Sequence, residues 1–375
     1  MLTPEQIQSL SDHFLLIAQP INQFLIKDIS RRVSEAGQLT SSAAYQIYRA
    51  QQLGMSQKEI KEKIKKELKI ADKTLELLLT QSAEVGYNFD IKRFSPSAIP
   101  FSENTGIQKT VQAAINLAKE DFSNLTQTLG MVDPFGNPQS LQSAYQKTMD
   151  FAFEQVFTGA ADYNTAISNA CKNIARYGVR VIDYESGVHT SLEAATRRNM
   201  MGGLGLMQEQ ISQQNHDDLG ANGWEISAHA ASAPDHEPIQ GKQYTDEEYQ
   251  AINGRLRRRI GTLNCGHVAF PIILGSNSPQ YSSQQLEEFR RDNEKGVDYE
   301  GRHFKTVYEA TQYQRQIERA IRLQKNKKIV AESTGNETQK QSAKIKLKRL
   351  NAEYKHFSAV AGFPMINERL KVFSA

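Results

Sequence analysis

The chain has 375 residues, enough for two or three domains of ordinary size, and its apolar (39%) and charged (23%) fractions allow a buried core and exclude global disorder. A net charge of +3 argues against a dedicated nucleic-acid-binding protein, although a local basic surface stays compatible with it. Two cysteines exclude a disulfide framework and fit a reducing cytoplasm, and we expect neither a signal peptide nor a membrane-spanning helix.

Residues 1–140 are predicted to form a helical N-terminal region. Thr3 is a suitable N-cap for a first helix, and Pro20 is expected to kink or split that helix. The spacing of Ser56 and Glu59 is typical of a capping box, so a new helix is expected to start there. Apolar periodicity predicts the helices of this region at 4–36, 43–53, 56–68, 73–85 and 108–128. Glycine and proline predict an irregular connection at 86–105. They also predict a turn-rich linker at 129–138, near which a subdomain boundary is expected.

Residues 141–218 are predicted to form a helical middle region. Cys171 falls on the apolar side of a helix and is expected to be buried and unreactive. A short strand and turn are expected next, and Thr190 or Ser191 then caps a helix. That helix has three glycines that weaken helical propensity by about 1 kcal/mol each, which close packing against another backbone would explain: Gly202, Gly203 and Gly205. The predicted helices are 141–157, 163–177 and 192–214.

Residues 219–275 differ from the rest and are predicted to form a compact α+β module. The segments WEISAHAASAPDHEPIQGKQY (224–244) and NCGHVAFP (264–271) contain short β-like runs, turns and the only Trp of the chain. Zinc prefers cysteine thiolate and neutral histidine in a tetrahedron, so one hypothesis is a zinc site. Its candidate ligands are His229, His236, Cys265 and His267. The alternative is a hydrogen-bonded polar cluster around tight turns, with Cys265 buried and no cofactor.

The same side chains permit a hydrolytic hypothesis. His236 has Asp235 and Glu237 beside it, so a carboxylate could orient it as a general base and a metal could activate water, as in an HNH-type nuclease. Cys265 with His267 is a further candidate for nucleophilic chemistry. The pattern His-x-Pro is more simply a turn, and no oxyanion loop is evident. We therefore expect no catalytic residues and no enzyme activity.

A run of arginines lies between the two halves of the module. Its composition suits contact with DNA phosphates or with the acidic surface of another protein. A solvated loop or strand edge is an equally good interpretation. The candidate nucleic-acid or partner contacts are Arg255, Arg257, Arg258 and Arg259.

Residues 276–375 are predicted to form a C-terminal helical hairpin and tail. Apolar residues recur at helical spacing over 305–331 and as a coiled-coil seam over 339–357. These two segments predict an antiparallel hairpin about 30–40 Å long, at a rise of 1.5 Å per residue. A turn or small β-hairpin is expected before them, at 298–303. The whole chain is therefore predicted to be mainly α with one small α+β module.

Three groups of motifs give the chain a family resemblance. His229 precedes the segment DHEPIQGK (235–242) and the element NCGH (264–267). Upstream, the turn DYESG (183–187) is followed by an arginine pair, and downstream the helical hairpin carries Tyr308, Gln312, Arg315, Glu318 and Arg319. In these motifs the chain resembles the phage minor capsid protein 2 family, within the Mu F-like head morphogenesis proteins of tailed bacteriophages. The resemblance covers roughly residues 140–375, and the N-terminal third carries no matching motif.

The sequence departs from the family pattern at three positions. Ala228, Ile239 and Gly266 stand where the family usually has His, an aromatic residue and Arg. These changes leave the Pro/Gly turn framework intact, which favours a structural role for the motif.

The resemblance implies a minor structural protein of a phage head, present in few copies, that acts in head morphogenesis or accompanies the DNA on ejection. Its implied partners are the portal and other capsid proteins, with packaged DNA as a further candidate and no membrane or small-molecule substrate. It would be made in the bacterial cytoplasm and located in the virion. The alternatives are a metal-dependent nuclease or hydrolase on the module, and a DNA-binding packaging accessory.

Overall fold

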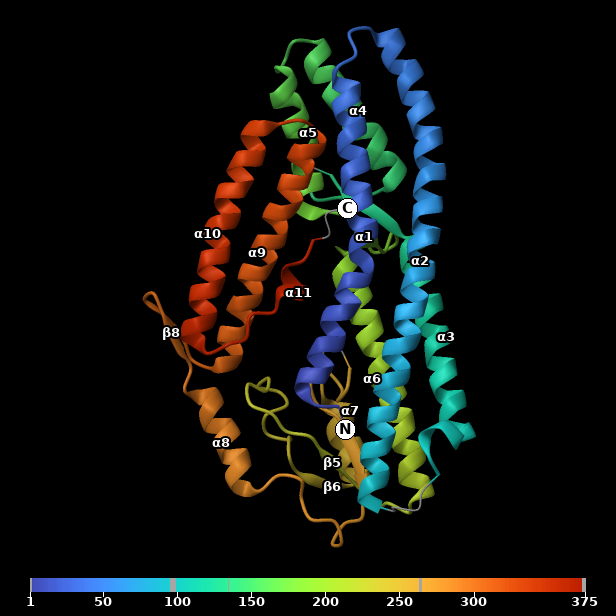
Figure 1. The fold of residues 1–375 in the computed structure, drawn as a ribbon, viewed down its shortest axis with the longest axis vertical. Coiled ribbons are helices and arrows are strands. Elements are labelled where there is room, and N and C mark those ends of the chain that lie inside the picture. Colours follow the sequence, from blue (N-terminus) through green and yellow to red (C-terminus); the bar gives the residue numbers. More distant parts are fainter. Residues whose placement is uncertain (1, 95–98, 134, 263–264, 373–375) are drawn as a thin grey trace.

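The computed structural model describes residues 2–94, 99–133, 135–262 and 265–372. Asn264 of the NCGH motif lies outside this part of the chain. Long helices dominate, and short antiparallel strands lie between them (Figure 1). The helices are α1 (Pro4–Gly37), α2 (Ser42–Phe94), η1 (Phe101–Glu103), α3 (Thr105–Gln127), α4 (Leu141–Phe157), α5 (Tyr163–Tyr177), α6 (Leu192–Asp218), α7 (Asp246–Arg255), α8 (Ser283–Glu294), α9 (Val307–Ser333), α10 (Glu337–Ala361) and α11 (Asn367–Leu370).

The strands form three small antiparallel sheets. Their orders are β2-β1-β3-β4, β6-β5-β7 and β8-β9. The strands are β1 (Leu129–Val132), β2 (Pro138–Ser140), β3 (Arg180–Ile182), β4 (His189–Ser191), β5 (Gly223–Ile226), β6 (Gln243–Thr245), β7 (Ala269–Ile272), β8 (Val297–Tyr299) and β9 (Arg302–Phe304). The chain is mainly α with small α+β content, as predicted.

Helix α1 is the central helix of the molecule, and α2, α4, α5, α6 and α9 pack around it (Figure 1). Thr3 caps it in a capping box with Gln6, as its sequence favours. The expected split at Pro20 does not occur, because α1 is one helix from Pro4 to Gly37. Proline inside a helix costs about 3 kcal/mol, and the apolar side chains of α1 that the neighbouring helices bury outweigh that cost. The fully buried ones include Phe14, Ile21, Leu25, Ile26, Ile29 and Val33.

Helix α2 corrects three further expectations. It is a single helix of 53 residues, about 80 Å long at 1.5 Å per residue, where separate helices were predicted. Ser56 lies inside it and begins no helix, and Glu59 forms an ion pair with the buried Arg32 of α1. The helix also continues through Gly86 to Phe94, so the irregular connection predicted at 86–105 begins later than expected; residues 95–98 lie outside the described part of the chain. Packing against α1, α3, α4 and α6 outweighs the cost of about 1 kcal/mol for each glycine.

Residues 129–138, predicted to be a linker, contain the hairpin β1–β2. Leu129 pairs with Val181 of β3, so β1 is an inner strand of the four-stranded sheet. The Asp133 carboxylate accepts hydrogen bonds from the backbone N–H groups of Phe135 and Asn137 and closes the turn. The turn residues were thus located correctly, but the strands on either side of them were missed.

The C-terminal helical hairpin is confirmed. Tyr313 of α9 donates a hydrogen bond to Glu353 of α10 at 2.7 Å, and Phe357 is fully buried between the hairpin and β8–β9. The chain then returns to α1 through α11 (Figure 1). There Arg369 contacts the Asp12 carboxylate at 2.8 Å, and both side chains are buried. Among the described helices, none is long and apolar enough to cross a membrane.

Candidate functional site

The His/Cys module, residues 219–275, is built on the three-stranded sheet β6-β5-β7 and the helix α7. Trp224 of β5 stacks on Tyr249 of α7 and on His216 at the end of α6. The module also meets α6 at Gly205, where an added Cβ would lie 1.8 Å from the carbonyl oxygen of Gly261. Close backbone packing therefore explains Gly205 as predicted. It does not explain Gly202 and Gly203, where an added Cβ would have no neighbour within 4 Å.

Three of the four predicted metal ligands come together in the module. The ligand atoms of His236, Cys265 and His267 lie within 4.8 Å of one another, and all three residues are buried. The Cys265 Sγ is 3.3 Å from the Nδ1 of His236 and 3.5 Å from the Nδ1 of His267. The two imidazole rings are close to perpendicular, at 78°. Two histidines that are far apart in the sequence, His236 and His267, thus face the sulfur atom of Cys265.

The outer nitrogens of both rings make hydrogen bonds to oxygen. The Nε2 of His236 is 2.8 Å from the carbonyl oxygen of Arg258, and that of His267 is 3.0 Å from the side-chain oxygen of Gln240. The same Gln240 oxygen accepts a hydrogen bond from the backbone N–H of His229. These contacts fix the orientation of both rings toward Cys265.

His229 lies beside this cluster but outside the group of three. Its ring stacks on that of His267, with centroids 4.3 Å apart. Its Nδ1 donates to the carbonyl oxygen of Ala230 at 2.8 Å, and its buried Nε2 has no hydrogen-bond partner among the described residues. A Cβ added at Gly266 would lie 3.0 Å from this Nε2. The fourth candidate ligand is therefore adjacent, with a free nitrogen.

Burial favours the neutral forms of His267, His229 and Cys265. It lowers the pKa of His267 well below its usual range, and it also lowers the pKa of His229. It raises the pKa of the Cys265 thiol. Neutral imidazole is the form of histidine that binds metals.

The structure does not place Asp235 or Glu237 in position to orient His236 as a general base. The Asp235 carboxylate is 3.8 Å from the Nε2 of His236 and instead forms an ion pair with Arg258 at 2.5 Å. Glu237 accepts a hydrogen bond from Asn293 of α8. The Nε2 of His236 contacts the carbonyl oxygen of Arg258, and its Nδ1 faces the sulfur of Cys265. Neither Asp235 nor Glu237 therefore orients this ring as a general base.

Two of the four arginines in the run form ion pairs within the described part of the protein, and two do not. Arg258 pairs with Asp235, and Arg259 pairs with Glu209 of α6 at 2.5 Å. Arg255 and Arg257 are exposed, and neither has an ion-pair partner among the described residues. Two of the four candidate contact residues thus hold the module together, and two remain available to a partner.

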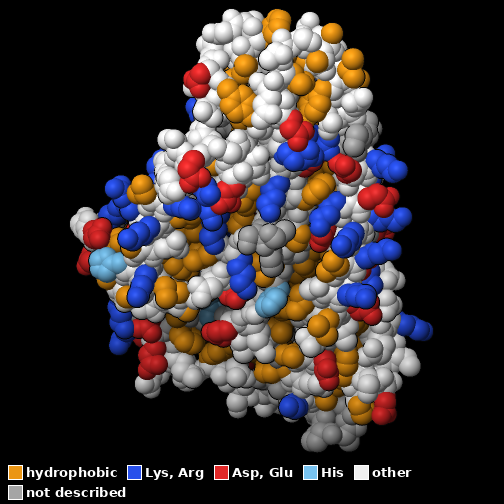
Figure 2. All heavy atoms as spheres, turned by 45° about the horizontal axis from the view of Figure 1, so that its top comes forward, with side chains coloured by type: hydrophobic (Ala, Val, Ile, Leu, Met, Phe, Trp, Pro, Cys, Tyr) orange, Lys and Arg blue, Asp and Glu red, His pale blue; other side chains and the backbone are white. Residues whose placement is uncertain are grey.

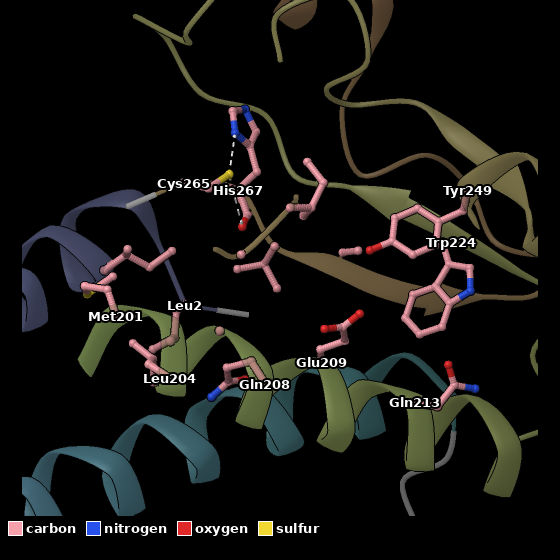
Figure 3. A pocket seen from close by; sticks show the side chains of 16 residues that line it. Leu2, Met201, Leu204, Gln208, Glu209, Gln213, Trp224, Tyr249, Cys265 and His267 are labelled. Carbon is pink, nitrogen blue, oxygen red and sulfur yellow. Dashed lines mark hydrogen bonds between the residues drawn. The ribbon is translucent and has the colours of Figure 1, made fainter. Parts of the chain in front are cut away.

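Two cavities adjoin the cluster. A small one of about 60 Å³ lies between α6 and the module, where Cys265 and His267 form one end (Figure 3). A larger one of about 450 Å³ lies where α1, α6, α9, the C-terminal segment and the module meet. Basic residues from four separate segments reach the larger cavity together with the four candidate ligands: Arg197, Arg258, Arg315 and Arg369. The sequence shows these arginines but not that they meet.

Comparison with known proteins decides the family. The profile of phage minor capsid protein 2 matches residues 2–359. The chain belongs to this family. The match includes the N-terminal third, in which no motif was found by inspection. Neither the comparison with curated proteins nor that with solved structures yields a match.

Membership of this family gives the protein a structural role in a phage head. Its location is therefore the virion, where it interacts with other phage head proteins. The recognised motifs 183–187, 235–242 and 264–267 lie in the turn β3–β4 and in the module, at the described positions.

Proposed function

We propose that this minor capsid protein is a low-copy component of the head that contacts the portal and acts in head morphogenesis, or accompanies the DNA on ejection. The proposal rests on the extent of the family match, residues 2–359, which covers both the helical bundle and the His/Cys module. The match therefore extends over nearly the whole chain and is not limited to one shared motif.

An exposed apolar end of the helical bundle supports docking on another head protein. Figure 2 shows hydrophobic side chains at the end of the molecule where the α1–α2 and α4–α5 connections lie, with charged side chains mainly on the flanks. Ile47 of α2 and Phe157 of α4 are 62% and 54% exposed, and Phe151 is 42% exposed. Exposed apolar patches of this kind mark interaction sites.

The deciding experiment is quantitative mass spectrometry of purified particles before and after DNA ejection. A few copies per particle support the low-copy role, and loss on ejection makes the protein cargo that leaves with the DNA. Absence from particles contradicts the proposal.

Substitution of the exposed end tests the docking. Ile47→Glu with Phe157→Glu is expected to abolish incorporation into particles without unfolding the protein, because a charge at an apolar contact must be desolvated. Val188→Glu is the matched control, since Val188 is 66% exposed and lies in the β3–β4 turn, outside the α1–α2 and α4–α5 connections. Normal incorporation of the double variant would place the portal contact elsewhere.

A second candidate function is metal-dependent hydrolysis of an anionic substrate. One observation favours it: the 450 Å³ cavity brings the candidate metal ligands and arginines together. A metal can activate water, and arginine can hold a phosphate. Incubation of the protein with duplex DNA and zinc, manganese or magnesium should then give cleavage that His236→Ala removes. No cleavage with any of these ions would eliminate this candidate.

DNA contact, the packaging alternative, depends on Arg255 and Arg257. If they contact phosphates, duplex binding should weaken steeply with salt, and the double Ala variant should reduce the slope by roughly two. Arg290 and Arg291 of α8, which are paired with Glu287, serve as the control pair. Equal binding by both double variants would exclude the exposed arginines as the DNA contact.

A further inference from the structure

For neutral rings, the outer contacts of the His/Cys cluster determine which nitrogen of each histidine carries the hydrogen. A carbonyl oxygen only accepts, so the Nε2 of His236 must carry a hydrogen and donate it to Arg258. A neutral imidazole has one N–H, which leaves the Nδ1 of His236 as a lone pair directed at the Cys265 Sγ. The outer contact therefore fixes the tautomer in which the inner nitrogen is free to accept.

His267 repeats this arrangement. The Gln240 oxygen already accepts from the backbone N–H of His229, which identifies it as the acceptor end of the amide. The Nε2 of His267 therefore donates to it at 3.0 Å, and the Nδ1 of His267 is a second lone pair directed at Cys265. Metal-binding histidines usually donate their outer N–H to a carbonyl or carboxylate oxygen in this way.

Hydrogen bonding alone leaves this cluster unsatisfied. The Cys265 thiol has one hydrogen and faces two accepting nitrogens, so it can satisfy only one of them. The sulfur also accepts from the backbone N–H of His267 at 3.4 Å, a contact that favours a thiolate. The buried Nε2 of His229 is a further lone pair without a donor among the described residues. Buried polar atoms without partners are rare in native proteins and call for an explanation.

A divalent ion would satisfy the sulfur and both inner nitrogens at once. In tetrahedral zinc sites with Zn–S near 2.3 Å and Zn–N near 2.0–2.1 Å, sulfur and nitrogen ligands lie roughly 3.5–3.6 Å apart. The observed Sγ–Nδ1 distances are 3.3 and 3.5 Å. The three ligand atoms are thus already spaced for one ion, which would bind the thiolate and both inner nitrogens.

We propose that His236, Cys265 and His267 bind a zinc ion, with the Nε2 of His229 in the fourth position. His229 stacks on His267, and Gly266 leaves it room, since any side chain there would press on its Nε2. One thiolate and three imidazoles suit zinc better than magnesium or calcium, which prefer oxygen ligands. Four protein ligands make the site structural and leave no position for substrate.

The position of the site explains what the ion does for the fold. The ligands come from the loop after β5, the turn that contains His236, and the segment before β7. Among the described residues, the apolar cluster at this end of the module is small: Trp224, Ile226, Tyr249, Ile260 and Cys265. An ion that joins three loops adds the stability that so small a core lacks.

The test uses the full chain, purified under reducing conditions without chelator, and measures zinc by mass spectrometry. About one zinc per chain is expected, because four ligands form one site. Replacement of zinc by cobalt should give the visible absorption of a tetrahedral ion and a thiolate-to-cobalt charge-transfer band. Chelation should change the emission of Trp224, the only Trp of the chain and a member of the module core.

Cys265→Ser should abolish both zinc binding and the charge-transfer band, and His229→Ala should change the visible cobalt spectrum. The matched control is Cys171→Ala, since Cys171 is the other buried cysteine and lies in the helical bundle. Circular dichroism of each variant confirms that the helices remain folded. Zinc retained by Cys265→Ser, or no zinc or cobalt bound by the wild-type chain, would overturn the proposal. An unchanged cobalt spectrum in His229→Ala would overturn the assignment of the fourth ligand.

Discussion

The helical bundle and the His/Cys module are stabilised in different ways. The bundle core contains large apolar side chains from each of the helices α1 through α6 and from α9, and many of these side chains are fully buried. The module has a smaller apolar cluster around Trp224, Ile226, Tyr249 and Ile260. Beside it lies a buried group of imidazole, thiol, amide and carbonyl groups that contact one another. Full burial of a large apolar side chain contributes about 1.5–3 kcal/mol. The bundle can therefore tolerate a proline or a glycine inside a helix. The stability of the module depends instead on a hydrogen-bond or metal partner for each of its buried polar atoms.

The largest expected effect is in the bundle. Phe14→Ala should lower the free energy of unfolding by about 3–5 kcal/mol, because the side chain is fully buried in α1 and leaves a cavity. Chemical denaturation followed by circular dichroism measures the loss. Phe135→Ala is the control, since Phe135 is 89% exposed and should change stability by less than about 0.5 kcal/mol. Equal losses in the two variants would contradict apolar burial as the source of bundle stability.

A buried ion pair inside the bundle gives the next effect. Arg369→Met should cost about 3–5 kcal/mol, because it removes the guanidinium that contacts Asp12 at 2.8 Å and Glu318 at 3.6 Å in a buried site. Limited proteolysis should show early cleavage after α10, as the C-terminal segment leaves α1. The exposed Arg319→Met is the control. A variant as stable as wild type would mean that the apolar contacts of Leu370 suffice to hold this segment.

The junction between the two regions gives a smaller effect. Gly205→Ala should destabilise the protein by about 1–3 kcal/mol, since its Cβ would lie 1.8 Å from the Gly261 carbonyl and push the module away from α6. Gly203→Ala has open space at the same helix and should instead stabilise by up to about 1 kcal/mol. Trp224 emission separates module loss from global unfolding. The same sign in both variants would show that helix propensity, not packing, governs this contact.

The smallest effect belongs to an exposed contact between the regions. Arg259→Ala should cost at most about 1 kcal/mol, because Arg259 and Glu209 are 50% and 38% exposed and solvent screens their ion pair. The loss should shrink further in high salt. A loss above 2 kcal/mol, measured by denaturation, would show that this ion pair anchors the module more firmly than its exposure implies.

Local patterns predicted the elements that local forces determine. The helices α4 and α5 have the predicted bounds, and Ser191 caps α6 as expected. Long-range contacts decided the errors. The predicted breaks in α2 are absent because four other helices pack on it, and β1 was missed because Leu129 pairs with Val181, which is distant in sequence. Tertiary packing overrides weak propensity in both places.

The candidate site was only partly predictable for the same reason. The side-chain types pointed to His229, His236, Cys265 and His267, and the fold brings the last three together. The contacts that orient them were hidden, since one is a backbone carbonyl, at Arg258, and another is the amide of Gln240. A carbonyl group has no signature in a sequence, because every residue has one. The arginines that line the larger cavity were hidden by distance along the chain.

The contact between α11 and α1 has a consequence for the timing of folding. Arg369 follows Asp12 by 357 residues, so at synthesis rates of about 5–20 residues per second the first helix waits roughly 20–70 s for this partner. During that interval the Asp12 carboxylate lacks the guanidinium that contacts it in the folded protein. Only a chain that includes α11 can therefore form this buried ion pair and complete the N-terminal end of α1.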